Sequence, residues 1–150
     1  MAHEDRSKNF IRKFAKFILI AVVIFIVGGS IFLFFKIKIQ AHDVLREAKN
    51  VRMALRTADI ELYGVGKTVF NPIKANGLED GAKEKAERIY QPEGTYKISS
   101  YDTKEHEITS MSYRRGNYLV TFSKKGDDIT WDVNFQLNVY HSDESDVIVD

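Results

Sequence analysis

Three short stretches of this sequence combine residue types that could do chemistry. The first, Gly66-Lys67-Thr68 in "ELYGVGKTVFNP", is the end of a phosphate-binding loop, in which backbone N–H groups surround the phosphates. A complete loop needs a glycine where this chain has Glu61, and it follows a strand, whereas a helix is expected here. We therefore predict no nucleotide site, and we expect Gly64 to end the helix as a left-handed cap.

The other two stretches contain a histidine and paired carboxylates. In "KEHE", His106 lies between two glutamates, but neighbouring strand residues face opposite sides and no H-E-x-x-H spacing occurs. Asp127 and Asp128 are expected in a solvated turn beside lysines. The chain has no cysteine, which excludes disulfides and thiolate metal sites, and no serine, histidine and acid constellation stands out. We expect no metal, no cofactor and no enzymatic activity.

The apolar residues are concentrated in "FILIAVVIFIVGGSIFLFF", residues 17–35, which are 19 residues without a charge. A helix of this length spans roughly 28 Å, close to the hydrocarbon core of a bilayer. A cleaved signal peptide has a shorter apolar run and a small-x-small site, which Ile39 and Ala41 imitate poorly. The sequence predicts a basic leader over 1–16 and an uncleaved signal-anchor helix over 17–35. The positions expected to contact lipid or neighbouring subunits are Phe17, Ile20, Ile24, Val27, Ile31 and Phe34.

The charges on the two sides of this segment predict its orientation. Residues 1–16 hold five bases and two acids, net +3, and the remaining chain holds 17 bases and 19 acids, net −2. Only Lys36 and Lys38 follow the segment closely, so in the cell membrane the N-terminus is expected in the cytoplasm and the C-terminal domain outside it. A slightly acidic exported domain is a poor candidate for binding nucleic acid.

Residues 17–35 are apolar on all sides, whereas residues 36–63 have the pattern of an amphipathic helix. Apolar residues recur at alternating intervals of three and four, which is typical of one helix face, and no proline or glycine occurs between Ser30 and Tyr63. We expect one continuous helix from about Ser7 to Tyr63, whose second half is a stem. Either the chain's own C-terminal domain packs on the apolar face of this stem, or part of the face meets the same helix of neighbouring subunits. The face consists of Ala41, Val44, Ala48, Val51, Leu55, Ala58 and Leu62.

The remainder predicts a small antiparallel sheet. Residues 64–94 read as a connecting loop with one short helix, for which Asp80 is the expected N-cap. From Thr95 the apolar period becomes two, and tight-turn sequences at 114–117 and 124–128 predict a meander over 95–140, followed by an acidic tail, 141–150. The fold class is therefore α+β, with the sheet packed on the stem. Expected strands are 95–99, 107–113, 117–123 and 128–140, and in the last strand the sheet core is expected at Trp131, Val133, Phe135 and Leu137.

This order of elements, with "AHDVLREAKNVRMALRTADIELYG" as the amphipathic half of the long helix, resembles type IV pilins and the pseudopilins of secretion systems. The processing motif of that family is absent: its nearest match, "NFIRKF", has Asn9 in place of glycine and Phe14 in place of the acidic residue. The resemblance implies a structural subunit of a pilus or secretion-type assembly, which contacts the lipid bilayer and associates with itself or with other membrane-anchored subunits. The alternative is a membrane-tethered binding module that does not polymerise and recognises a partner through its sheet.

Overall fold

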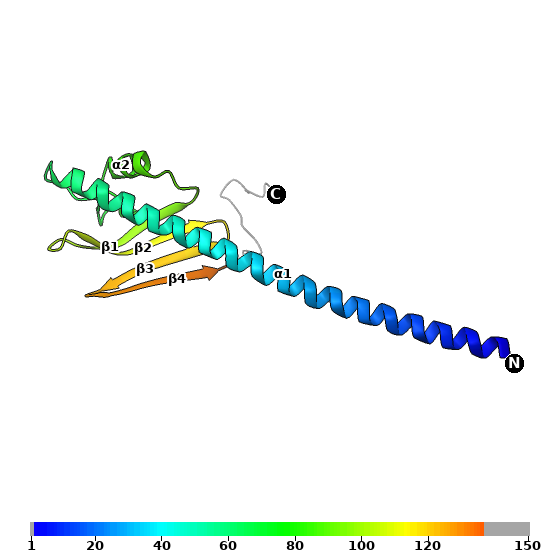
Figure 1. Ribbon diagram of the computed structural model, residues 1–150. Coiled ribbons are helices and arrows are strands. Elements are labelled where there is room, and N and C mark those ends of the chain that lie inside the picture. Colours follow the sequence, from blue (N-terminus) through cyan, green and yellow to red (C-terminus); the bar gives the residue numbers. More distant parts are fainter. Residues whose placement is uncertain (1, 137–150) are drawn as a thin grey trace, which may run out of the picture. The chain divides into compact units, whose positions relative to one another are not determined.

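The computed structural model describes the backbone of residues 2–136 and the side chains of residues 13–136. The chain divides into two compact units, Met1–Gln40 and Ala41–Asp150. Figure 1 shows the long helix and the sheet. The fold is α+β, as expected: one long N-terminal helix is followed by a small four-stranded antiparallel sheet. The elements are α1 (Ala2–Tyr63), α2 (Ala82–Ile89), β1 (Thr95–Asp102), β2 (Glu107–Arg115), β3 (Tyr118–Lys125) and β4 (Asp128–Phe135).

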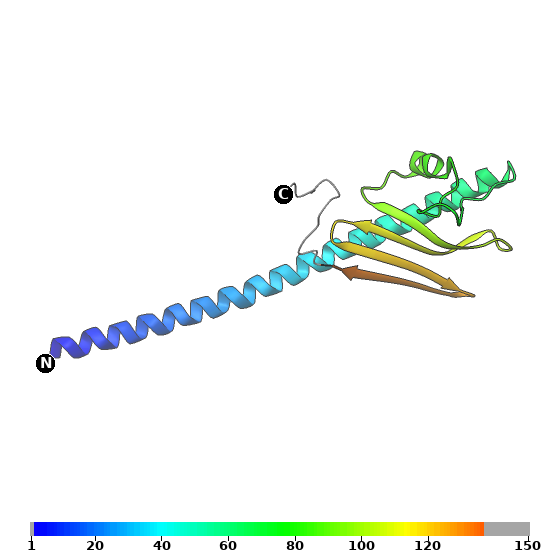
Figure 2. The same ribbon diagram turned by 180° about the vertical axis from the view of Figure 1, so that it is seen from behind.

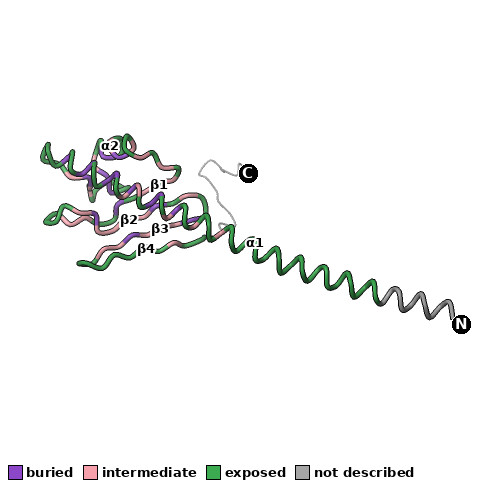
Figure 3. The backbone as a smooth tube through the Cα atoms, in the orientation of Figure 1, coloured by how far each residue is buried: buried purple, intermediate pink, exposed green. Residues whose placement is uncertain are grey.

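Helix α1 begins before the expected Ser7 and ends at the expected Tyr63. All residues from 17 to 35 are exposed, with Phe25 at 83%. By length and composition, this apolar helix near the N-terminus could cross a membrane. Figure 3 shows the change from this exposed part of α1 to the part that carries buried residues.

The sheet of the second unit is a simple meander with the strand order β1-β2-β3-β4. Two-residue turns join β2 to β3 and β3 to β4, and each begins with a glycine at positive φ: Gly116 (54°) and Gly126 (59°). A glycine at the first turn position is typical of type II′ turns, whose twist matches that of the flanking strands. Figure 2 shows the four strands along the second half of α1.

The core of the second unit lies between α1 and the sheet. Every residue of the predicted stem face is buried except Ala41, which is half-buried. The chain's own domain therefore covers this face. The sheet contributes its buried residues from the first three strands: Ile98, Ile108, Met111, Tyr113, Tyr118, Val120 and Phe122.

Strand β4 corrects the prediction of the sheet core. Its apolar residues share one face, since Trp131, Val133 and Phe135 pair with the buried Phe122, Val120 and Tyr118 of β3. However, Trp131 and Val133 are only half-buried, and Phe135 is 41% exposed. The reason is position: β4 is the last strand of the sheet, where α1 no longer covers the face fully. Leu137 and the predicted tail 141–150 lie outside the described residues.

Two predicted helix caps are also wrong. The left-handed residue after α1 is Gly66 (φ 76°), not Gly64, because the N–H groups of Gly66 and Lys67 bond back to the carbonyls of Tyr63 and Leu62. This pair of bonds is the Schellman motif. At α2 the cap residue is Gly81, which has no side chain to bond the helix, while Asp80 forms an ion pair with Lys74.

Candidate functional site at the helix–sheet boundary

Three charged residues of α1 make side-chain contacts from the stem to the sheet: Glu47, Arg52 and Asp59. Among the described residues, Glu47 (5% exposed) and Asp59 (4%) are the buried charged side chains. A buried charge is costly unless it is paired or hydrogen-bonded, so the partners of these two carboxylates determine what they do.

Glu47 holds the loop before β1 and the end of β2. One carboxylate oxygen accepts the Glu93 N–H at 2.7 Å, and the other lies 2.8 Å from Nη1 of Arg115. Beside it, the Tyr113 hydroxyl accepts the Gly94 N–H at 2.8 Å. Burial, followed by the hydrogen bond to Glu47, raises the pKa of Tyr113. This group ties the early part of the stem to the sheet.

Arg52 lies in the middle of the boundary. Its Nη2 donates to Glu107 Oε1 at 2.6 Å, and its guanidinium lies 4.2 Å from the centre of the Phe122 ring. Burial lowers the pKa of Arg52, although Glu107 opposes this effect. Glu107 also binds Lys124, and that hydrogen bond is the main reason why the pKa of Glu107 falls below its ordinary value.

Asp59 joins three segments near the end of the helix. Its Oδ1 accepts the Val69 N–H at 2.6 Å, and its Oδ2 accepts the Tyr101 hydroxyl at 2.7 Å. His106 Nδ1 lies 3.4 Å from the Tyr101 oxygen, and the His106 ring meets the Tyr63 ring edge-on at 4.6 Å. His106 is exposed in the β1–β2 turn with a left-handed backbone (φ 50°), and its ring contacts the end of the helix.

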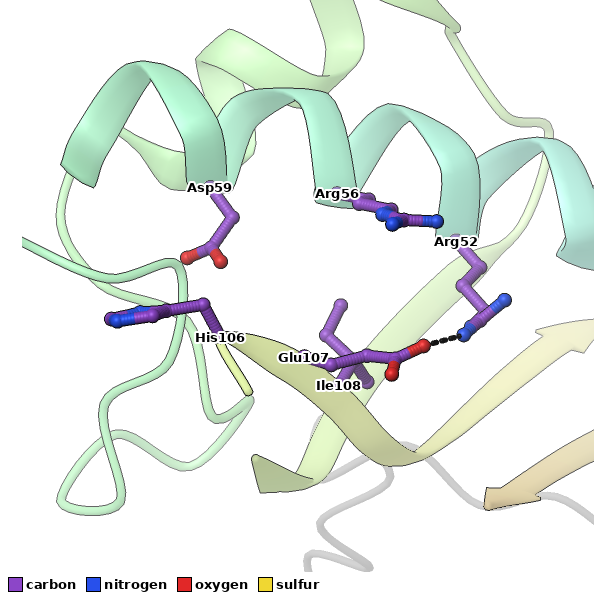
Figure 4. Close-up of a pocket in the computed structure, with 6 residues that line it drawn as sticks. All are labelled: Arg52, Arg56, Asp59, His106, Glu107 and Ile108. Carbon is purple, nitrogen blue, oxygen red and sulfur yellow. Dashed lines mark hydrogen bonds and ion pairs between the residues drawn. The ribbon is translucent and has the colours of Figure 1, made fainter. Parts of the chain in front are cut away.

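A small pocket opens between these groups, and Figure 4 shows Arg52, Arg56 and Asp59 of α1 facing the residues at the start of β2. The space inside is about 10 Å³, which is close to the minimum for one water molecule. The carboxylates that line it already accept hydrogen bonds from the protein. Within residues 13–136, no group of three or more histidines and carboxylates could hold a metal ion. The contacts around this pocket hold the sheet on the helix.

The predicted stem face is buried, whereas no hydrogen bond or ion pair between described residues joins the three stretches whose residue types could do chemistry. Gly66 to Thr68 follow the helix end, His106 lies in the β1–β2 turn, and Asp127 and Asp128 are exposed at the β3–β4 turn. Sequence reasoning missed Glu47 and Asp59 because a charge beside an apolar stripe is normally solvated. The sequence signal that could have indicated their burial is their position: Glu47 precedes Ala48 and Asp59 follows Ala58, two residues of the stem face.

Compared with models of known protein families, with curated proteins and with solved structures, the chain matches none of them.

Proposed function

We propose that this chain is a single-pass membrane protein whose α+β domain lies outside the cytoplasm and acts as a structural, pilin-like subunit of a pilus or secretion-type assembly. The observation that supports this proposal is the difference in burial between the two halves of α1. Residues 17–35 are apolar and exposed throughout, while the stem face that follows is buried by the chain's own sheet. An apolar helix without cover needs lipid or other helices around it.

The orientation rests on the charges before and after residues 17–35, with more bases on the N-terminal side. The burial of Val51, Leu55 and their neighbours also limits how subunits would meet, because this face is already occupied. Contacts between subunits would therefore use the membrane segment and other surfaces of the domain.

Cysteine cross-linking of the full chain in its membrane tests this proposal, since the chain has no cysteine of its own. Single cysteines at Phe17, Ile20, Ile24, Val27, Ile31 and Phe34 should give disulfide-linked dimers at positions that repeat with helical spacing. Val51→Cys, at a position buried in the domain, is the matched control and should give none.

The second candidate, an anchored binding module, is favoured by one observation, the incomplete cover of β4. It predicts that no membrane position gives dimers while the chain still fractionates with the membrane. Recovery of the chain in the soluble fraction would contradict both candidates, since both need the anchor.

A further inference from the structure

The two edges of the sheet differ in how they are covered. At the β1 edge, the Ile98 N–H donates to the Asn76 carbonyl at 3.0 Å, so the connecting loop lies against this strand. Among the described residues, no segment pairs with the outer edge of β4. An open edge presents unpaired backbone groups to any extended chain, and proteins commonly block it with lysine, proline or a bulge. β4 has no lysine or proline, and its eight pairs with β3 run without a shift in register.

The register identifies the backbone groups at this open edge. The two-residue turn makes Lys125 and Asp128 a hydrogen-bonded pair, and the Gln136 N–H, which follows the same register, donates to the Asn117 carbonyl at 2.7 Å. Because hydrogen-bonded pairs alternate along an antiparallel ladder, even-numbered residues of β4 bond to β3. The N–H and C=O groups that point away from β3 are those of Ile129, Trp131, Val133 and Phe135.

The same four residues carry the apolar side chains that α1 leaves partly uncovered. Ile129 is 52% exposed, and Trp131 is half-buried with the Lys49 ammonium 5.8 Å from its ring centre. On the other face, Asp128, Thr130, Asp132 and Asn134 are exposed. A strand added here would extend the covered apolar face on one side and meet carboxylates on the other.

We propose that the outer edge of β4 is a docking site for an extended segment of another protein, in which apolar side chains alternate with basic ones. Backbone hydrogen bonds along the edge require a strand, the uncovered face of Ile129 and Phe135 requires apolar side chains, and Asp132 favours a cation opposite it. The inference holds for either function proposed above, since it concerns the domain and not the anchor.

A second copy of this chain fits the edge less well. A second β4 would bring no cation to Asp128 and Asp132, because β4 contains aspartates but no lysine or arginine. Parallel pairing in register would place each Asp132 beside its own counterpart, and like charges side by side are unfavourable.

The test uses the full chain in nanodiscs of zwitterionic lipid, so that basic peptides are not drawn to the lipid. Trp131 is the chain's single tryptophan and reports binding at β4 directly by its fluorescence. The probes are two blocked peptides of eight residues, one alternating valine with lysine and one alternating valine with glutamate. The lysine peptide should shift the Trp131 emission and bind about ten-fold more tightly than the glutamate peptide. Equal binding of the two peptides, or no binding, overturns the proposal.

Two variants locate the site. Asp132→Lys should reverse the preference between the peptides. Val133→Pro removes an N–H that points to the open edge, where proline is tolerated, so binding should be lost with the thermal unfolding midpoint nearly unchanged. If Val133→Pro does not fold, a lysine peptide with a central proline replaces it and should not bind the natural chain. Unchanged binding in any of these cases contradicts docking at β4.

Amide hydrogen exchange of the chain without peptide tests whether another part of the chain, or a second copy of it, already covers the edge of β4. The proposal expects fast exchange at Trp131 and Val133 in the free chain and slow exchange after the lysine peptide is added. Slow exchange in the free chain at every protein concentration would mean that the chain covers its own edge. Slow exchange only at high concentration would mean that a second copy does. Either result overturns the proposal.

Discussion

The Asp59 carboxylate accepts a hydrogen bond of 2.7 Å from the hydroxyl group of Tyr101, a residue 42 positions away in the sequence. The other carboxylate oxygen accepts the Val69 N–H. One side chain near the end of α1 thus holds both the start of the connecting loop and the first strand. With Glu47 and Arg52, it makes the orientation of the sheet on the stem depend on a few directional contacts, in addition to apolar packing.

Removing the Asp59 carboxylate should destabilise the domain strongly. Asp59→Ala leaves the buried Val69 N–H without its acceptor, which costs about 1–3 kcal/mol, and it also removes the carboxylate that accepts the half-buried Tyr101 hydroxyl. Chemical unfolding of the full chain in detergent, followed by circular dichroism, measures the loss. Glu61→Ala, on the same helix but at an exposed position paired with Lys85, should cost much less, because exposed ion pairs contribute little to stability. Equal losses for the two variants would contradict the role of Asp59.

Identical substitutions in β3 and β4 should differ in cost. Phe122 is 1% exposed and lies under the Arg52 guanidinium, while Phe135 is 41% exposed. Phe122→Ala should therefore lower the free energy of unfolding by about 3–5 kcal/mol, and Phe135→Ala by less than half of that. The measurement is the same denaturant titration. A larger loss for Phe135→Ala would mean that the face of β4 is covered.

This contrast shows what sequence patterns can and cannot predict. The three-four spacing from Val44 to Leu62 indicates both the helix and its buried face, because one face of a helix has one environment. The alternation in β4 indicates which side chains share a face, but burial depends on the place of the strand in the sheet. Residues of one polar contact also lie far apart in the sequence: Glu47 and Arg115 are separated by 68 positions. No local pattern identifies such a pair.

Acid should weaken the domain partly through Glu107. Its pKa is held below the ordinary value of 4.5, first by the hydrogen bond from Lys124. A carboxyl with a lowered pKa in the folded state contributes stability above its unfolded pKa, and this contribution is lost as the pH falls through the folded pKa. Glu107→Gln should therefore lower stability near pH 7 and flatten its fall below about pH 4.5. The unfolding midpoints of the natural chain and of Glu107→Gln, followed against pH, measure this effect, and parallel profiles would contradict the role of Glu107.

The two glycines after α1 should respond oppositely to alanine. Gly66 has φ of 76°, a conformation that costs an L-residue about 1–2 kcal/mol, so Gly66→Ala should be destabilising by that amount. Gly64 does not have a positive φ, and a Cβ atom there would lie 3.5 Å from the Glu61 carbonyl oxygen, an ordinary van der Waals distance. Gly64→Ala should be neutral or stabilising by up to about 1 kcal/mol. The reverse order in thermal unfolding would place the cap at Gly64.

The stem half of α1 should be indispensable to the domain, whereas the apolar half should not. A fragment of residues 41–150 keeps Val44, Val51, Leu55 and Leu62, which are buried against the sheet. Deleting residues 1–63 removes them, and four large apolar side chains contribute roughly 6–12 kcal/mol, comparable with the whole stability of about 5–15 kcal/mol for a typical domain. We expect 41–150 to unfold cooperatively and 64–150 to show no cooperative transition by circular dichroism and no dispersed amide signals by NMR.

Both fragments should remain in the soluble fraction, which separates loss of the anchor from loss of folding. A folded 64–150 fragment with the same unfolding midpoint as 41–150 would mean that the sheet and α2 form a core without the stem.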